Sequence, residues 1–326
     1  MSGVSGSTAT ATTATAESAQ RRPAAPCAIV GRFAPSPTGA LHLGSLVAAL
    51  GSFVDARSRG GRWLVRIEDL DHARNVPGTA EQMLRTLEAF GLHWDGIVEC
   101  QSARIAHYRE ALEALMARGL TFECSCTRRE REGQGGYPGT CRSGPQRPGP
   151  TATRLRVSGG TLCFEDRVQG RCSFAMSERG DVVVRRRDGV FAYQLAVVVD
   201  DALQGITDVV RGADLLDSTP WQISLQQALG FTLPQYLHLP LIREPDGRKL
   251  AKSRRCVALD PARAGAQLFR VLALLRQEPP AELELEPASS VLRWACQHWR
   301  PERLQALREI RLAAQSQSAP GGARGV

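Results

Sequence analysis

Two patterns of apolar residues alternate along the first third of the chain. Apolar runs at 27–33 and 63–69 are typical of buried strands, and stretches with apolar residues at every third or fourth position follow them. These helix-like stretches lie near 43–54, 79–90 and 102–118. The second stretch opens with Thr79 and Gln82, which predict a capping box. The alternation predicts an α/β fold with a parallel sheet covered by helices.

Residues 120–190 break this rhythm. They contain a cluster of cysteines and a segment rich in proline and glycine at 133–150. Short strand-like runs lie near 153–157, 161–168 and 182–186. Afterwards the apolar runs Leu195–Val199 and Ile206–Val210 resume the alternation of strands and helices. We therefore interpret 120–190 as an insertion between two halves of one sheet.

These patterns divide the chain into segments of different character. The expected order is a disordered extension (1–26), the first half of the α/β unit (27–119), the insertion (120–190), the second half of the unit (191–256), a helical C-terminal part (257–313) and a tail (314–326). The second half is predicted to contain a helix near 220–229 and a strand near 236–242. The extension lacks the apolar block of a secretory signal, so disorder is expected rather than a targeting role, with a transit peptide as the alternative.

Composition narrows the possible partners. The net charge is +8 and the isoelectric point is near 9.3, which favours a polyanion such as nucleic acid, although membrane surfaces also attract cations. No stretch approaches the ~18 apolar residues of a membrane span, so no membrane association is expected. The nine cysteines are odd in number and mostly scattered, which indicates a reducing compartment. We expect a cytoplasmic monomer.

The segment Arg32–Ser45 joins the first predicted strand to the first predicted helix. In an open α/β sheet such a loop lies in the crevice where ligands bind. Its glycines, which include Gly44, let a ligand approach the backbone, and the helix N-terminus favours phosphate. His42 in the first turn can donate a hydrogen bond to a phosphate oxygen, although a lone histidine on a helix is more often structural.

A second candidate for phosphate chemistry is the segment Lys249–Ser253. Lys249 and Lys252 are the only lysines in a chain whose other 39 basic residues are arginine. Two ammonium groups on a loop flanked by glycine and proline can neutralise charge as a phosphoryl bond breaks. The alternative is a solvated basic loop, which does not explain why the lysines occur here alone.

At these positions the chain resembles the class I aminoacyl-tRNA synthetases in their glutamyl form. Arg32–Ser45 is similar to the HIGH signature of that family, and Lys249–Ser253 is similar to its KMSKS signature. The segments 66–71, 193–201 and 206–216 resemble the catalytic core of the same family. The resemblance covers about 27–259 and implies a Rossmann-type parallel sheet. It also implies catalytic roles for His42, Lys249 and Lys252, with ATP bound by His42, Gly44 and Lys252.

The resemblance further implies a pocket for glutamate. Arg32 and Arg211 can pair with carboxylates, and Glu68 can pair with the α-ammonium group. Tyr193 can close one side of the pocket, and Ser36 can add a hydrogen bond. The implied ligand set is completed by Phe33, Ala34 and Pro35. The sequence leaves open which arginine binds which carboxylate, whether Glu68 instead pairs with Arg66 or Arg74, and whether Tyr193 is a core aromatic residue.

The insertion carries a candidate metal site. Cys124, Cys126 and Cys141 lie within 18 positions, which is close enough to begin a tetrahedral zinc site. Tyr137 and a water molecule are alternatives for the fourth ligand, and the resembled family uses tyrosine at this place. We expect one structural Zn²⁺ per chain, with reduced free thiols as the alternative.

The length of the chain after Ser253 refines the expected activity. Only 73 residues follow it, too few for the anticodon-binding domain of the family. The chain thereby resembles a truncated branch that activates L-glutamate with Mg²⁺ and ATP, without tRNA, and attaches it to the queuosine base in the anticodon of tRNA(Asp). The alternatives are a glutamyl-tRNA synthetase without its anticodon-binding domain and a non-catalytic, zinc-containing RNA-binding relative.

Overall fold

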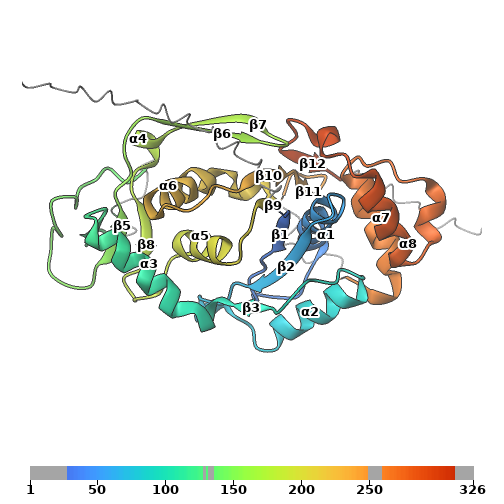
Figure 1. The fold of residues 1–326 in the computed structure, drawn as a ribbon, viewed down its shortest axis with the longest axis horizontal. Coiled ribbons are helices and arrows are strands. Elements are labelled where there is room, and N and C mark those ends of the chain that lie inside the picture. Colours follow the sequence, from blue (N-terminus) through green and yellow to red (C-terminus); the bar gives the residue numbers. More distant parts are fainter. Residues whose placement is uncertain (1–27, 128–129, 131–135, 249–258, 313–326) are drawn as a thin grey trace, which may run out of the picture.

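The structure, a computed structural model, describes residues 28–127, 130, 136–248 and 259–312 (Figure 1). Its centre is a seven-stranded sheet with the strand order β3-β2-β1-β9-β10-β6-β7. The strands are β1 (Val30–Phe33), β2 (Arg62–Ile67), β3 (Glu99–Cys100), β6 (Thr161–Asp166), β7 (Gly170–Ala175), β9 (Asp208–Gly212) and β10 (Gln235–Leu239). All neighbours are parallel except β6 and β7, which form an antiparallel hairpin. The predicted α/β class with a mostly parallel sheet is confirmed.

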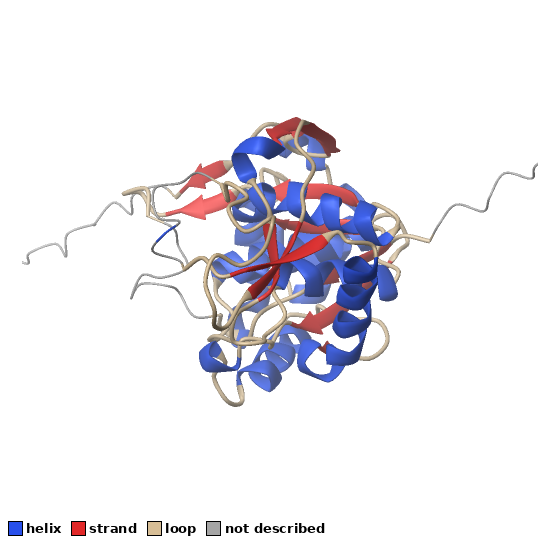
Figure 2. Cartoon of the chain, turned by 90° about the vertical axis from the view of Figure 1, so that its left-hand side faces the viewer, coloured by secondary structure: helices blue, strands red, loops and turns tan. Residues whose placement is uncertain are grey.

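Helices cover both faces of this sheet, as Figure 2 shows. The helices are α1 (Leu43–Arg57), α2 (Thr79–Ala89), α3 (Ile105–Ala117), α4 (Met176–Arg179), α5 (Tyr193–Leu203), α6 (Thr219–Leu229), α7 (Ala264–Leu274) and α8 (Ala288–His298). Within β2, Trp63 and Val65 pack into the cluster under α1, whereas Leu64 faces the opposite cluster with Ile223 of α6. Apolar residues on both sides of a strand produce the short continuous runs that the sequence shows.

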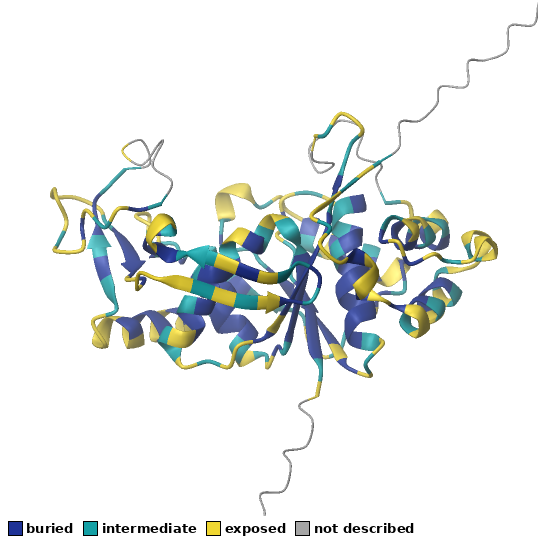
Figure 3. Ribbon diagram, turned by 90° about the horizontal axis from the view of Figure 1, so that it is seen from above, coloured by how far each residue is buried: buried dark blue, intermediate teal, exposed yellow. Residues whose placement is uncertain are grey.

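Two smaller sheets flank the central one. The strands β4 (Thr121–Cys124), β5 (Ala152–Leu155) and β8 (Val182–Arg185) form an antiparallel sheet at the green, left-hand end of Figure 1. Near the other end, β11 (Leu241–Arg243) pairs in parallel with β12 (Glu309–Arg311), beside α7 and α8. The segment 120–190 therefore builds one separate sheet and also adds the β6–β7 hairpin to the central sheet. Exposed residues alternate with half-buried or buried ones along most of this hairpin (Figure 3).

Two sequence predictions about local structure are wrong. The run Leu195–Val199 is not a strand but part of α5, where all five residues are buried. A helix that is buried on every side carries the same unbroken apolar run as a strand. Thr79 and Gln82 form no capping box, because the cap of α2 is Gly78, whose left-handed backbone (φ 74°) leads the chain directly into the helix.

Candidate active site

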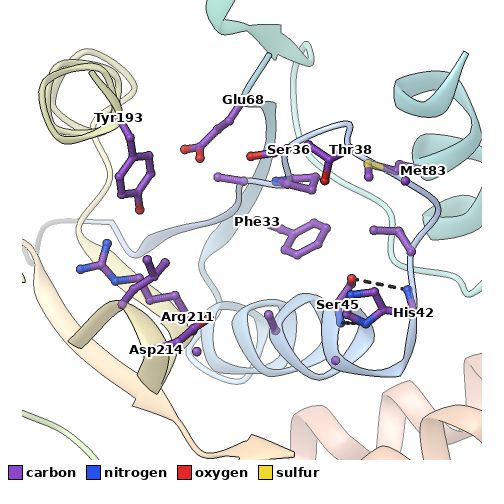
Figure 4. A pocket seen from close by; sticks show the side chains of 18 of the residues that line it. Phe33, Ser36, Thr38, His42, Ser45, Glu68, Met83, Tyr193, Arg211 and Asp214 are labelled. Carbon is purple, nitrogen blue, oxygen red and sulfur yellow. Dashed lines mark hydrogen bonds between the residues drawn. The ribbon is translucent and has the colours of Figure 1, made fainter. Parts of the chain in front are cut away.

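A cavity of about 890 Å³ opens at the carboxyl ends of β1, β2 and β9. Parallel strands bring the loops that follow them to one edge of the sheet, and ligands of such folds bind there. Figure 4 shows Glu68, Tyr193 and Arg211 on one side of this cavity and His42 at the other. The cavity is lined by every predicted substrate residue that the structure describes: Arg32, Phe33, Ala34, Pro35, Ser36, His42, Gly44, Glu68, Tyr193 and Arg211. Lys249 and Lys252 lie outside the described residues.

Arg211, on β9, presents one edge of its guanidinium to the protein. Its Nε donates to Nε2 of His238 at 3.1 Å, and its Nη2 donates to Oγ1 of Thr219 at 2.9 Å. Its Nη1 is buried and has no hydrogen-bond partner among the described residues. A buried donor without a partner is costly, and a carboxylate in the cavity would satisfy it.

Arg32, on β1, is bound more fully by the protein. Its Nε and Nη2 donate to the two carboxylate oxygens of Asp201 at 3.2 and 3.3 Å, and its Nη1 lies 3.4 Å from the carbonyl oxygen of Val210. Burial disfavours the charge of Asp201, but Arg32 and Arg66 keep the pKa of this carboxyl below its ordinary value. Arg32 is therefore a fixed cation in the wall of the cavity.

Glu68 follows β2 and faces the same space. Burial raises the pKa of Glu68 to about 7, although Arg66 and Arg32 favour its charged form. Its Oε1 lies 3.5 Å from Nη2 of Arg66, so the ion pair considered from the sequence is present but long. An ammonium group in the cavity would further favour the charged form of this carboxyl. Tyr193, at the first turn of α5, borders the cavity, and burial raises the pKa of its hydroxyl.

His42 caps the N-terminus of α1. Its Nδ1 accepts a hydrogen bond from the backbone N–H of Ser45 at 3.3 Å, and the Ser45 hydroxyl accepts from the backbone N–H of His42 at 3.4 Å. A neutral ring that accepts at Nδ1 carries its proton at Nε2. Gly44 lies against this ring, since a Cβ at position 44 would stand 3.0 Å from Cε1 of His42. The cap thus fixes both the tautomer and the orientation of the imidazole beside a helix N-terminus that favours anions.

A layer of buried polar residues behind the cavity was not predicted. Asp200 accepts hydrogen bonds from Gln101, Arg104 and Tyr108, and Asp201 binds Arg32 and Arg66. Adjacent carboxylates inside an apolar run were the available signal for this pair. His238 and Asp166, which support Arg211, gave no signal, because His238 is a lone polar residue among leucines and Asp166 is one of three consecutive charged residues.

The cysteine cluster lies where β4 ends at Cys124. The Sγ atoms of Cys124, Cys126 and Cys141 all lie within 4.8 Å of one another. The Tyr137 hydroxyl lies 3.4 Å from Sγ of Cys124 and 3.8 Å from Sγ of Cys126. The structure thus brings together the four side chains that the sequence singled out. The guanidinium of Arg154 stacks 4.0 Å above the ring of Tyr137.

The protonation of this cluster is uneven. Burial disfavours the thiolate of Cys141, but hydrogen bonds, first of all with Tyr137, lower the pKa of Cys141 to about 6. Burial and the neighbouring Cys141 raise the pKa of Cys126 to about 11, and burial raises the pKa of Tyr137 as well. Cys141 therefore loses its proton more readily than Cys126 or Tyr137.

Comparison with known proteins places this geometry in a family. Residues 28–263 match the family described as "tRNA synthetases class I (E and Q), catalytic domain". The match extends over well more than half of the chain, so the chain belongs to the class I tRNA synthetase family of the E and Q type. No helix among the described residues is both long and apolar enough to cross a membrane.

Individual relatives give a closer comparison than the family as a whole. The chain is 54% identical over 277 residues to the "Glutamyl-Q tRNA(Asp) synthetase" of Pseudomonas aeruginosa, covering 84% of this chain and 94% of that protein. It is also 54% identical to the protein of the same name from Dechloromonas aromatica, over 82% of this chain and 93% of that one. A solved glutamate tRNA ligase from Elizabethkingia meningosepticum, in complex with its amino acid, superposes with a TM-score of 0.72 at 25% identity, covering 88% of this chain and 67% of that chain.

Proposed function

We propose that the chain is an ATP-dependent ligase that activates L-glutamate as glutamyl-adenylate and transfers the glutamate to the queuosine base in the anticodon of tRNA(Asp). The observation that carries the first step is the joint placement of Arg211, Glu68 and His42 around one cavity. The relatives named glutamyl-Q tRNA(Asp) synthetase, which match over most of the chain, support the choice of acceptor. The substrates are cytoplasmic molecules, so we place the enzyme there, acting as a monomer.

The charges of the cavity suit those of L-glutamate. The amino acid has two carboxylates and one ammonium group, and the cavity offers two buried guanidiniums and one buried carboxyl. Arg211 has the better donor geometry of the two arginines, because its Nη1 is unpartnered among the described residues while Arg32 already binds both oxygens of Asp201. Glu68 binds the α-ammonium, Tyr193 borders the bound amino acid, and Ser36 adds a hydrogen bond.

The other end of the cavity suits a nucleotide. An oxygen of the glutamate α-carboxylate attacks the α-phosphorus of ATP, the bond from that phosphorus to the bridging oxygen breaks, and pyrophosphate leaves with its Mg²⁺. The His42 Nε2–H and the N-terminus of α1 donate to phosphate oxygens as negative charge develops there. We assign the remaining charge neutralisation to Lys249 and Lys252 on the strength of their motif alone.

The second step consumes the adenylate. A hydroxyl of the queuosine cyclopentene ring attacks the activated carbonyl carbon, the bond from that carbon to the phosphate oxygen breaks, AMP leaves, and the hydroxyl proton is released to water. The main contribution of the protein is to place the reactants, which is worth several kcal/mol when the reacting atoms are near contact.

We further propose that Cys124, Cys126, Tyr137 and Cys141 bind one structural Zn²⁺. Zinc–sulfur bonds of ~2.3 Å in a tetrahedron place two sulfurs ~3.8 Å apart. The Sγ atoms of Cys126 and Cys141 are 3.5 Å apart, so this pair already has nearly that spacing, and all three sulfurs lie within 4.8 Å of one another. The apolar core of this loop is small and consists of Phe122 and the four ligands. The metal would supply the stability that so small a core cannot provide.

Exchange of radiolabelled pyrophosphate into ATP tests the first step. With L-glutamate and no RNA, we expect exchange well above the background with L-glutamine or L-aspartate. Exchange that appears only when tRNA is added would favour the alternative of a glutamyl-tRNA synthetase. Absence of exchange under every condition would favour the non-catalytic relative.

A further inference from the structure

A chain of buried polar contacts connects Arg211 to the inserted segment. His238 on β10 lies beside Arg211 on β9, and Asp166 at the end of β6 lies beside His238. The distance from Nδ1 of His238 to Oδ2 of Asp166 is 2.6 Å, and both side chains are fully buried. The three residues lie far apart in the sequence and come from both sides of the insertion boundary.

The protein fixes the orientation of Asp166 independently of His238. Its Oδ1 accepts backbone N–H groups from Val168 at 3.0 Å, Gln169 at 2.8 Å and His238 at 3.2 Å. Only Oδ2 remains for the imidazole. A carboxylate at 2.6 Å requires a proton on Nδ1 of His238, because a carboxylate oxygen only accepts hydrogen bonds.

The protonation of Nε2, on the other side of the His238 ring, follows from that of Nδ1. Burial lowers the pKa of His238 to about 4, in spite of Asp166, so the ring is neutral at physiological pH. A neutral ring with its proton on Nδ1 has a lone pair on Nε2. That lone pair accepts the Nε–H of Arg211 at 3.1 Å. The contact with Arg211 is satisfied in this tautomer only, since an Nε2–H would face the Nε–H of Arg211 even where it donated to Oγ1 of Thr219, which lies 3.2 Å from Nε2.

We infer that Asp166 and His238 are positioning residues that orient the Arg211 guanidinium, and thereby leave its Nη1 edge to the substrate carboxylate. This inference rests on the proposed binding of glutamate in the cavity. Asp166 holds the tautomer of His238, and His238 and Thr219 then bind the Nε and Nη2 edge of Arg211. A residue of the inserted segment thus sets the donor geometry of the amino-acid site.

The substitution Asp166→Asn tests the inference with almost no change in volume. The amide oxygen keeps the three backbone N–H groups, which turns the NH₂ toward Nδ1 of His238. The ring must then accept at Nδ1 and carry its proton on Nε2, against Arg211. We expect the KM for glutamate in pyrophosphate exchange to rise about tenfold or more, the scale of one lost buried hydrogen bond, with the KM for ATP within about twofold.

Asp208→Asn is the matched control. Asp208 lies on the same strand as Arg211, is equally buried and loses the same charge, but it pairs with Arg59 and Arg167 at the other end of β9. Its KM for glutamate should equal that of the wild type. A merely structural role for Asp166 would lower the melting temperature of both variants and leave the KM for glutamate unchanged in the fraction that remains folded.

A pair of substitutions at His238 gives a second test that does not depend on the folding of Asp166→Asn. In His238→Gln the amide oxygen can take the place of Nε2 and accept from Arg211, whereas in His238→Asn the shorter side chain does not reach. Glutamate KM should therefore be closer to wild type for His238→Gln than for His238→Asn. Equal values for the two variants would overturn the inference.

A spectroscopic measurement reads the tautomer itself. In protein with ¹⁵N-labelled histidine, long-range proton–nitrogen correlations should show His238 protonated at Nδ1, assigned by the loss of its signals in His238→Gln. A wild-type ring protonated at Nε2 would overturn the inference, as would an unchanged glutamate KM in folded Asp166→Asn. A wild-type protein that activates no glutamate would instead defeat the proposed function, with the tautomer still observable.

Discussion

Replacement of Arg211 by lysine separates the geometry of the glutamate site from its charge. The wild-type guanidinium donates to His238 and Thr219 with one edge and leaves Nη1 for the ligand. Lysine keeps the positive charge but concentrates it in one ammonium group, which cannot bind both the protein acceptors and a carboxylate in a two-bond arrangement.

The structure sets the scale of the loss. A hydrogen bond between charged groups contributes about 1.5–3 kcal/mol, and Arg211→Lys removes at least one of the two that a carboxylate can receive. A loss of about 2–3 kcal/mol corresponds to a 30- to 150-fold weaker Kd. The affinity for ATP should remain, because Arg211 and His42 border opposite sides of the cavity.

Isothermal titration calorimetry with glutamate and with Mg·ATP, each alone, measures both affinities. Arg171→Lys is the matched control, because Arg171 is exposed on β7, away from the cavity residues. Its affinities should equal those of the wild type. A parallel loss of glutamate and ATP affinity in Arg211→Lys would mean that Arg211 supports the fold, and an unchanged glutamate affinity would refute its assignment to the carboxylate.

Four further predictions concern the same cavity and the cysteine cluster. Glutamate binding should weaken as the pH falls below about 7, the pKa of Glu68, and Glu68→Gln should bind weakly at every pH; a wild-type affinity independent of pH between 5.5 and 8 would contradict the pairing of Glu68 with the α-ammonium. The pKa of Glu68 is about 7 in the folded chain, above its ordinary value of 4.5. The contribution of this carboxyl to the free energy of unfolding is therefore present below pH 4.5 and is lost as the pH rises through about 7. At pH 8, Glu68→Gln should raise the melting temperature. Gly44→Ala should displace the His42 ring and slow pyrophosphate exchange at least tenfold, yet change the melting temperature little, because the gain of about 1 kcal/mol from alanine in a helix offsets a loss of about 1 kcal/mol from the broken His42 cap; normal exchange would show that the ring position is not needed. Metal analysis should find one zinc per chain, and Tyr137→Phe should lose it faster to a chelator than the wild type; equal retention would assign the fourth position to water, and absence of zinc in protein purified without chelator would refute the site.

The part of the site that could be predicted lies at the carboxyl ends of strands or directly after them. Arg32, Glu68 and Arg211 come at or just after the ends of apolar runs, and a parallel sheet brings such positions together whatever their separation in sequence. The cysteine cluster was predictable for a different reason, because a spacing of few residues already limits how far apart the thiols can be.

The supporting contacts could not be predicted in this way. Asp201 binds Arg32 across 169 positions, and Asp166 binds His238 across 72. Asp201 lies next to Asp200, and Asp166 lies between Glu165 and Arg167, so neither stands out among its neighbours and no periodicity links it to its partner. The prediction of a strand at Leu195–Val199 was wrong for a different reason. The helix α5 is covered by α3, α6 and β8, so this part of it has no polar positions that would distinguish a helix from a strand.

Transfer of glutamate to RNA tests the central claim most directly. Radiolabelled L-glutamate, Mg·ATP and the purified chain are incubated with tRNA(Asp) that contains queuosine, with tRNA(Asp) that lacks it, and with tRNA(Glu). We predict acid-precipitable label on queuosine-containing tRNA(Asp) alone, and loss of that label when Arg211 is replaced by lysine at limiting glutamate. Label on tRNA(Glu), or equal label on tRNA(Asp) with and without queuosine, would contradict the account.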